Sequence, residues 1–220
     1  MIRNLAAATL IVSMLSTTVG AAEQAAWRDK VTAFAAQNFK HPAWGYSHSQ
    51  RDYALARSMA AADHVTLDDD VLFAAAYLHD MAAFPKWAEK KDHSDVAAEK
   101  IDIVLAGTDF PEAKKEAVRA AIRTHMFYRD PVGPEARYLH DADALEWLGA
   151  IGIARDFAQV DPKGGKPLPQ DALKDLQEDR DKVPSHVVTP AGKALIAPRL
   201  AEEKAFLDAL RDETENFSAF

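Results

Sequence analysis

The chain of 220 residues contains no cysteine. Disulfide bonds and thiolate metal sites are therefore both excluded. Any metal site in this protein must be built from imidazole, carboxylate and backbone or water oxygen atoms. Internal repeats and low-complexity tracts are also missing from the sequence, so repeat architectures are not expected.

The chain also lacks an excess of basic residues. Lysine and arginine number 26 against 34 aspartates and glutamates, which gives a formal net charge of -8. Nucleic acids and anionic membrane surfaces are bound through basic patches, so we expect neither as a main partner. A small anionic substrate stays compatible with this charge, because a bound metal ion and one arginine dominate the local field. The hydrophobic fraction of 48% is enough for a packed core.

A hydrophobic run of membrane-spanning length is missing as well. Arg3 precedes a short apolar run over residues 5–15, and small residues follow over 16–22. This order is typical of a secretory signal peptide, and the run is too short for a stable transmembrane helix. We expect a signal peptide over 1–22 and an exported, periplasmic protein of one domain over 23–220 that is not membrane-bound after cleavage. An uncleaved N-terminal anchor is the alternative.

The apolar residues that follow recur at helical spacing, and no segment shows the alternation of a strand. The pattern predicts an all-α fold. We expect helices over residues 27–39, 48–62, 68–79, 94–105, 111–127, 136–160 and 189–213, with a loop at 163–167. The segment 136–160 is apolar on almost every side, so it should be the central buried helix.

His79 and Asp80 end a helix whose inward stripe contains Leu72, Ala75 and Ala76. That stripe places an imidazole and a carboxylate at the core end of the helix. Buried polar groups need partners, and both a metal ion and an ordinary hydrogen-bonded pair would satisfy these two. The pair alone favours the hydrogen-bonded interpretation.

Other residues strengthen the metal interpretation. His48 begins a predicted helix, His125 lies on the apolar stripe of another, and Asp141 and Asp143 open the most apolar helix. Carboxylates in such a helix usually mark a site. Imidazoles and carboxylates without thiolate suit Mn, Fe, Co, Ni or Zn, and with water ligands Mg as well.

The order His48, His79-Asp80, Asp143 resembles the H…HD…D motif of the HD-domain superfamily of metal-dependent phosphohydrolases. Arg51 after the first histidine, the segment Ala121-Ile-Arg-Thr-His125 and the segment 141–155 are also similar to its small single-domain bacterial members. The likeness extends over about residues 27–212. It implies a single-domain HD-domain helical bundle and hydrolysis of a phosphate ester or anhydride of a small molecule, with nucleotides among the candidates.

The resemblance also implies roles for individual residues. His48, His79, Asp80 and Asp143 would hold one divalent ion. Asp141 would be a cap or a supporting residue, with a ligand role as the alternative. His125 is either a further ligand or a buried neighbour, whereas His93 and His140 are more typical of surface or capping positions. Together with His125, these two histidines could form a second metal position.

For catalysis, we expect Asp80 or Glu146 to accept the proton of the attacking water, and Arg51 to neutralise charge on the phosphate. Lys86 is a second candidate for phosphate binding. The chain departs from the family pattern at Ala144, where a basic residue is usual, and over 81–85, where relatives carry an acidic residue. These departures keep open the alternative of a non-catalytic HD-fold binding protein. A di-iron oxygenase of the same superfamily is a further alternative if His93 and His125 are both ligands.

Overall fold

A computed structural model describes residues 26–218 and 220, and it is all-α over that part of the chain. The predicted signal peptide lies outside the described residues and stays a prediction. No described helix is long and apolar enough to cross a membrane. The helices are α1 (Ala26–Asn38), α2 (Tyr46–Ala62), α3 (Asp69–Leu78), α4 (His93–Lys100), α5 (Asp102–Leu105), α6 (Lys115–Arg123), α7 (Pro134–Leu145), α8 (Gly149–Phe157), α9 (Pro169–His186) and α10 (Pro190–Glu213), with short 3-10 turns at Met81–Ala83 and Glu112–Lys114.

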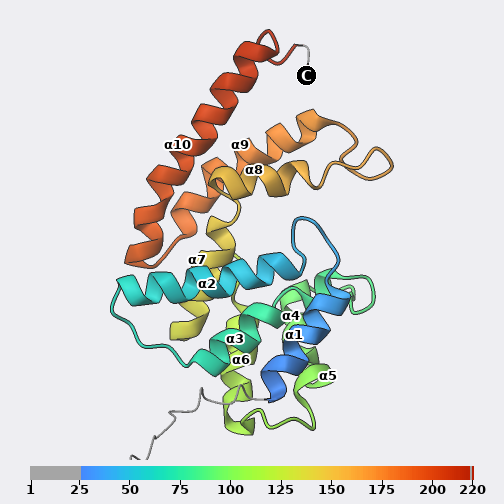
Figure 1. Cartoon of the computed structure of the whole chain (residues 1–220), viewed down its shortest axis with the longest axis vertical. Helices are drawn as coiled ribbons and strands as arrows, with labels where there is room; N and C mark the ends of the chain where they lie inside the picture. The colour runs from blue at the N-terminus through green and yellow to red at the C-terminus, as the bar shows by residue number, and fades with distance from the viewer. Residues whose placement is uncertain (1–25, 219) are drawn as a thin grey trace, which may run out of the picture.

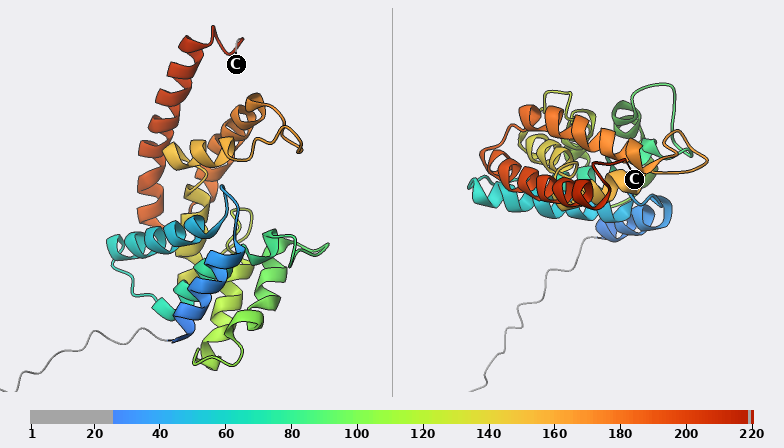
Figure 2. Two further views of the ribbon diagram at one scale, coloured as in Figure 1. Left: turned by 45° about the vertical axis from the view of Figure 1, so that its right-hand side comes forward. Right: turned by 90° about the horizontal axis from the view of Figure 1, so that it is seen from above.

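Helix α7 connects the two ends of the molecule (Figure 1). It packs on α2, α3 and α6 at one end and on α9 and α10 at the other. Helices α1 to α6 gather around the first end, and α8, α9 and α10 form the second, as the left view in Figure 2 shows. The central position predicted for the segment that starts at residue 136 is therefore confirmed for its first half.

Helix α3 is the most completely buried element. The side chain of Asp68 caps its first turn by accepting hydrogen bonds from the backbone N–H groups of Asp70 and Val71. Every residue from Val71 to Leu78 is then buried, so one continuous apolar segment passes through the core. The helix ends at Leu78, which delivers His79 and Asp80 directly into the interior.

The predicted helix over 136–160 is interrupted in the structure. Helix α7 ends at Leu145 and α8 begins at Gly149, whose φ of 75° lies in the left-handed region. A Cβ at Gly152 would come within 2.5 Å of the Trp147 backbone. The two glycines therefore allow a sharp turn that a continuous apolar pattern conceals.

Helix α9 was not predicted from the sequence. Only Ala172, Leu176 and Val183 of its 18 residues are buried. A helix that is polar on most of its surface gives a weak periodic signal. By contrast, the predicted start of the last helix is confirmed, because Thr189 Oγ1 accepts a hydrogen bond from the Gly192 N–H ahead of α10.

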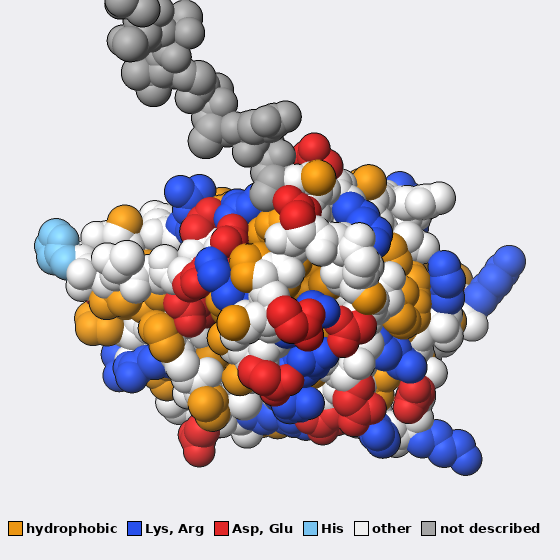
Figure 3. Space-filling view, turned by 90° about the horizontal axis from the view of Figure 1, so that it is seen from below, with side chains coloured by type: hydrophobic (Ala, Val, Ile, Leu, Met, Phe, Trp, Pro, Cys, Tyr) orange, Lys and Arg blue, Asp and Glu red, His pale blue; other side chains and the backbone are white. Residues whose placement is uncertain are grey.

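The face of the molecule seen from below carries interspersed acidic and basic side chains (Figure 3). Arg28 contacts Asp69 and Asp70 at 2.9 and 2.7 Å, and Lys114 lies 2.8 Å from Asp70. Such mixing keeps this face free of a large patch of one sign.

Candidate metal centre

Two imidazoles face each other at the centre of the fold. The Nδ1 of His48, at the start of α2, donates to the Glu146 carboxylate at 2.9 Å, and the Nδ1 of His79 donates to the Ala76 carbonyl at 2.8 Å. These bonds direct both Nε2 atoms inward, where they lie 3.2 Å apart. Both side chains are fully buried. Histidines oriented in this way by a second hydrogen bond are typical of metal sites.

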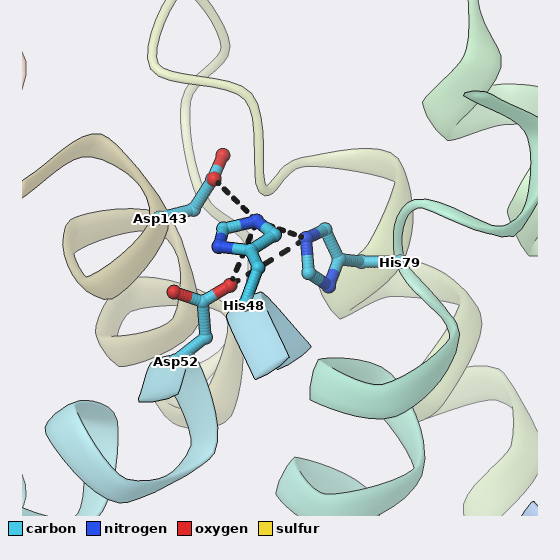
Figure 4. A group of neighbouring side chains, drawn as sticks. All are labelled: His48, Asp52, His79 and Asp143. Carbon is cyan, nitrogen blue, oxygen red and sulfur yellow. Dashed lines mark hydrogen bonds and ion pairs between the residues drawn. The ribbon is translucent and has the colours of Figure 1, made fainter. Parts of the chain in front are cut away.

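The two predicted carboxylate ligands approach the same point (Figure 4 shows Asp143 with the two histidines). Asp80 Oδ2 lies 3.5 Å from His48 Nε2 and 3.4 Å from His79 Nε2. Asp143 Oδ1, from α7, lies 3.3 Å from His48 Nε2. The structure thus brings together His48, His79, Asp80 and Asp143 from two helices, α2 and α7, and the turn after α3.

Asp52 is a further member of this cluster that the sequence reasoning missed (Figure 4). It lies one helical turn after His48, with Oδ2 at 3.1 Å from His48 Nε2 and 3.6 Å from His79 Nε2. The side chain is fully buried, and neither oxygen accepts a hydrogen bond from any described residue. The i, i+4 spacing from His48 was the signal that could have identified it.

The electrostatics of the cluster are those of a site that attracts a cation. Burial opposes protonation of His79, yet the neighbouring Asp80 carboxylate raises the pKa of His79 to about 9. Burial likewise opposes ionisation of Asp80, but the adjacent His79 imidazole keeps the pKa of Asp80 well below its usual range. At Asp52 burial prevails over the attraction of His48 and raises the pKa to about 7. The carboxylates thus favour the cationic form of both imidazoles, and a divalent cation bound to the two Nε2 atoms would supply that positive charge instead.

A second pair of histidines lies on the other side of Asp80. Asp80 Oδ1 is 3.4 Å from His93 Nε2 and 3.8 Å from His125 Nε2. His125 Nδ1 donates to the Ile122 carbonyl at 2.6 Å, and its buried Nε2 has no hydrogen-bond partner among the described residues. Burial, aided by the nearby His79, lowers the pKa of His125 to about 4, so its imidazole is neutral and can accept a metal.

Arg51 and Glu146 form one unit behind His48. The Nε and Nη2 atoms of Arg51 both donate to the Glu146 carboxylate at 2.7 Å. Glu146 therefore contacts the first histidine and the arginine at the same time. Lys86 lies away from the cluster, with Nζ 3.4 Å from Asn38 Oδ1.

A cavity of about 210 Å³ opens onto the cluster, and its walls include Asp80, Asp143 and His93. Arg155, from α8, also lines it. The Arg155 Nε donates to the Ala43 carbonyl at 2.9 Å and the guanidinium lies 3.7 Å from the Trp147 ring centroid. Its buried Nη1 has no hydrogen-bond partner in the described part of the chain. Arg155 belongs to the segment that carried the family resemblance, but its role was not predicted.

Asp141 and His140 contact each other rather than the cluster. His140 Nδ1 lies 3.0 Å from Asp141 Oδ1. The other Asp141 oxygen accepts hydrogen bonds from the backbone N–H of Thr189 at 2.7 Å and from its hydroxyl at 2.6 Å. Asp141 on α7 thus accepts hydrogen bonds from the residue that precedes α10. This is the geometry of the capping role expected from the sequence.

The sequence matches a known protein family over part of its length. Residues 45–148 match the family model of the HD domain, a range that contains all the cluster residues. No curated protein matches the chain.

Solved structures share the fold at low sequence identity. A Lactobacillus plantarum protein is 24% identical with a TM-score of 0.62, covering 85% of this chain and 96% of its own. A predicted HD superfamily hydrolase from an uncultured Thermotogales bacterium is 23% identical with a TM-score of 0.60, covering 85% and 90%. Bacillus subtilis YpgQ in complex with ADP is 17% identical with a TM-score of 0.62, covering 84% and 97%. The all-α HD-domain fold predicted from the sequence is thus confirmed.

Proposed function

We propose that this protein is a metal-dependent phosphohydrolase that cleaves a phosphate ester or anhydride of a small molecule. One observation carries the proposal. The donor atoms of His48, His79, Asp80 and Asp143 converge beside a cavity that Arg155 also lines. The buried Nη1 of Arg155 makes no hydrogen bond among the described residues and lies 3.8 Å from Glu146 Oε2. A cation site and a buried guanidinium in one cavity are the two features that phosphoryl groups require.

The residues present fit a divalent cation. Two imidazoles already hold their Nε2 atoms inward through hydrogen bonds at Nδ1. If those nitrogens bind a metal, the fully buried Asp52 has no described proton donor left, and coordination would satisfy its carboxylate. Two imidazoles and three carboxylates form a mixed nitrogen and oxygen site, which suits Mn, Fe, Co, Ni or Zn, and Mg with added water.

When bound, such a cation would polarise a phosphoryl oxygen and lower the pKa of a water towards neutrality. The side chains around it have separate tasks in the proposal. Arg155 would bind a phosphoryl oxygen through Nη1, because Arg155 lines the cavity and this nitrogen makes no hydrogen bond among the described residues, only a 3.8 Å contact with Glu146. Arg51 acts indirectly, since its fork holds Glu146 and Glu146 holds His48.

Asp80 is the better candidate for the proton acceptor. It lines the cavity and lies 3.4 Å from His93, whose side chain keeps 28% of its surface exposed and offers a route for the proton to solvent. Glu146 accepts from both Arg51 and His48, which leaves it little capacity to act as a base.

Nucleotides are among the phosphate compounds that we propose as substrates. The support comes from the structural neighbour YpgQ, which was solved with ADP bound. Nucleoside di- and triphosphates therefore belong in the first substrate panel, beside sugar phosphates and simple alkyl phosphates.

The test is a metal-dependent hydrolysis screen. The purified chain is treated with a chelator, reloaded with Mn, Co, Ni, Mg or Zn, and assayed against this panel. We expect activity that requires metal and disappears in His79→Ala while the helical circular dichroism is retained. His64→Asn, on an exposed turn away from the cluster, is the matched control and should keep full activity. If both variants keep the fold and no hydrolysis is seen with any metal, the result would support a binding protein instead.

A two-metal enzyme is a second candidate, and the position of Asp80 favours it. Its Oδ2 faces His48 and His79, whereas its Oδ1 faces His93 and His125. His48 and His79 would hold one ion and His93 and His125 a second, with Asp80 next to both, and two irons held in this way would supply the chemistry of an oxygenase. Metal analysis after aerobic purification decides between the candidates: two tightly bound irons per chain favour the oxygenase, and one exchangeable divalent ion favours the hydrolase.

A further inference from the structure

A second cavity adjoins the one described above. It has a volume of about 210 Å³ and lies between the end of α8 and the helix α9. Met126 and Trp147 contribute to the walls of both cavities, so the two are neighbours across these side chains. The second cavity is therefore close enough to the metal centre to be considered as a binding site for part of the same molecule.

The walls of this second cavity carry four carboxylates: Asp156, Asp175, Glu178 and Asp179. Asp156 is 1% exposed, and its Oδ2 has no hydrogen-bond partner among the described residues. An unsatisfied buried carboxylate oxygen that borders a cavity is costly unless a ligand completes it.

The cations near the cavity are already engaged. Lys166 pairs with Asp175, and Lys182 lies 2.8 Å from Glu178. Arg155 donates to the Ala43 carbonyl and lies over the Trp147 ring. Asp156 and Asp179 are left without an ion-pair partner in the described part of the chain.

Charge repulsion gives further support. Burial, followed by repulsion from Asp179 and Asp175, raises the pKa of Asp156 to about 8. Burial and the same Asp175 carboxylate raise the pKa of Asp179 to about 6. Both pKa values are raised in part because neighbouring carboxylates repel one another, and a bound cation would relieve this repulsion.

The shape of the site favours an organic cation over a metal ion. Among the described residues, only two groups of three or more potential ligands bring their donor atoms within 4.8 Å of one another, and neither includes these carboxylates. Two aromatic walls, Phe127 and Trp147, complete the cavity. Aromatic faces together with carboxylates bind alkylammonium groups, which are larger than a metal ion and less strongly hydrated.

We propose that this acidic cavity binds an ammonium group of the substrate, so that the substrate class is phosphoesters with an alkylammonium tail. The assignment rests on the proposed phosphohydrolase function. The phosphate would lie at the metal centre and Arg155, and the tail would pass Trp147 to reach Asp156 and Asp179.

The test compares ω-aminoalkyl phosphates with alkyl phosphates of the same length, in which a methyl group replaces the ammonium group. Chain length is varied, because the span from the metal centre to the acidic cavity sets the best fit. At the best length, we expect kcat/KM for the amine to exceed that for its methyl analogue at least about tenfold, the size of a desolvated charge-assisted contact. A ratio near one at every length would overturn the inference while leaving the hydrolase function in place.

Variants locate the effect. Asp179→Asn, at a half-buried position, and Asp156→Asn should each lower this ratio about tenfold, since each removes one group that would be a carboxylate beside the bound ammonium. Asp181→Asn is the matched control: it lies on the same helix, removes the same charge, and is exposed outside the cavity. An equal fall of the ratio in Asp181→Asn would contradict a local site.

A binding measurement separates this inference from the proposed function. If no phosphoester is hydrolysed, the hydrolase proposal fails. Calorimetric titration with pentylamine then tests separately whether the acidic cavity binds an ammonium group. Binding that is lost in Asp179→Asn and retained in Asp181→Asn supports the ammonium site. No binding to the wild-type chain overturns it.

Discussion

Glu146 Oε2 lies 2.9 Å from Nδ1 of His48, and this contact holds the imidazole with its other nitrogen towards the metal cluster. The carboxylate is itself fixed by the fork of Arg51. The glutamate that the sequence suggested as a base is thus placed to orient a ligand.

Glu146→Gln should therefore weaken metal binding about 10–100-fold, which is typical for residues that support metal-binding histidines. The measurement is a calorimetric titration of the metal-free variant with Mn²⁺. Glu112→Gln, at an exposed position, serves as the control and should bind like the wild type. A fall in kcat with unchanged metal affinity would instead assign Glu146 the role of base.

Asp52→Asn should weaken Mn²⁺ binding about tenfold or more, because it removes one of three carboxylate charges in direct contact with the two histidines. Without metal, the variant should be no less stable than the wild type, since the wild-type carboxylate has no hydrogen bond in the described structure. Urea unfolding of the chelated proteins measures this. Equal Mn²⁺ affinity in both proteins would exclude Asp52 from the site.

In contrast to Asp52→Asn, Asp141→Asn should reduce stability and leave metal binding unchanged. Its carboxylate accepts two hydrogen bonds from Thr189, so the change should lower the free energy of unfolding by about 1–3 kcal/mol. Mn²⁺ affinity should remain unchanged, as Asp141 belongs to neither group of potential ligands. Loss of metal affinity at near-normal stability would show that Asp141, and not Asp143, is the ligand.

Substitutions of Arg155 and Arg51 should have different effects on KM and on Mn²⁺ affinity. Arg155→Lys should raise KM for a phosphoester about tenfold and leave Mn²⁺ affinity unchanged, because a lysine keeps the charge but loses the planar fork. Arg51→Lys should instead weaken Mn²⁺ binding through Glu146. Steady-state kinetics and metal titration of both variants test this contrast, and a KM effect in Arg51→Lys alone would restore the assignment made from the sequence.

Glu203 should make stability depend on pH. Its side chain is buried, accepts the Gly149 N–H at 2.7 Å, and has a pKa that burial raises to about 7. A carboxyl group with a raised pKa in the folded state binds its proton more tightly there than in the unfolded chain, so stability falls as pH rises from the ordinary range to about 7. Arg180, 3.5 Å away, moderates the loss.

Glu203→Gln should remove this contribution. Below about pH 4, near the ordinary glutamate pKa, the variant and the wild type should be similarly stable, and above pH 7 the variant should be the more stable. Urea unfolding across this range provides the measurement. A stability difference that does not vary with pH would mean that Glu203 titrates normally.

The sequence predicted most of the framework of the site. Helical periodicity identified α3 and its end at the His79-Asp80 pair, because a fully apolar segment with acidic residues in its first turn has few other solutions. The family resemblance then selected His48 and Asp143 out of many polar residues. Periodicity failed at Gly149, where a positive φ ends an apolar run, and at α9, whose buried face is narrow.

The helical spacing of the apolar residues determined the fold class, and the resemblance to the HD-domain motif selected four side chains as candidate metal ligands. The tertiary structure alone decided that Asp52 joins them, that Arg155 faces the cavity, and that Glu146 supports His48. The physical reason is that a helical pattern reports which face of a helix is buried. Which side chains from other helices meet that face depends on crossing and packing, which are long-range relations in the chain.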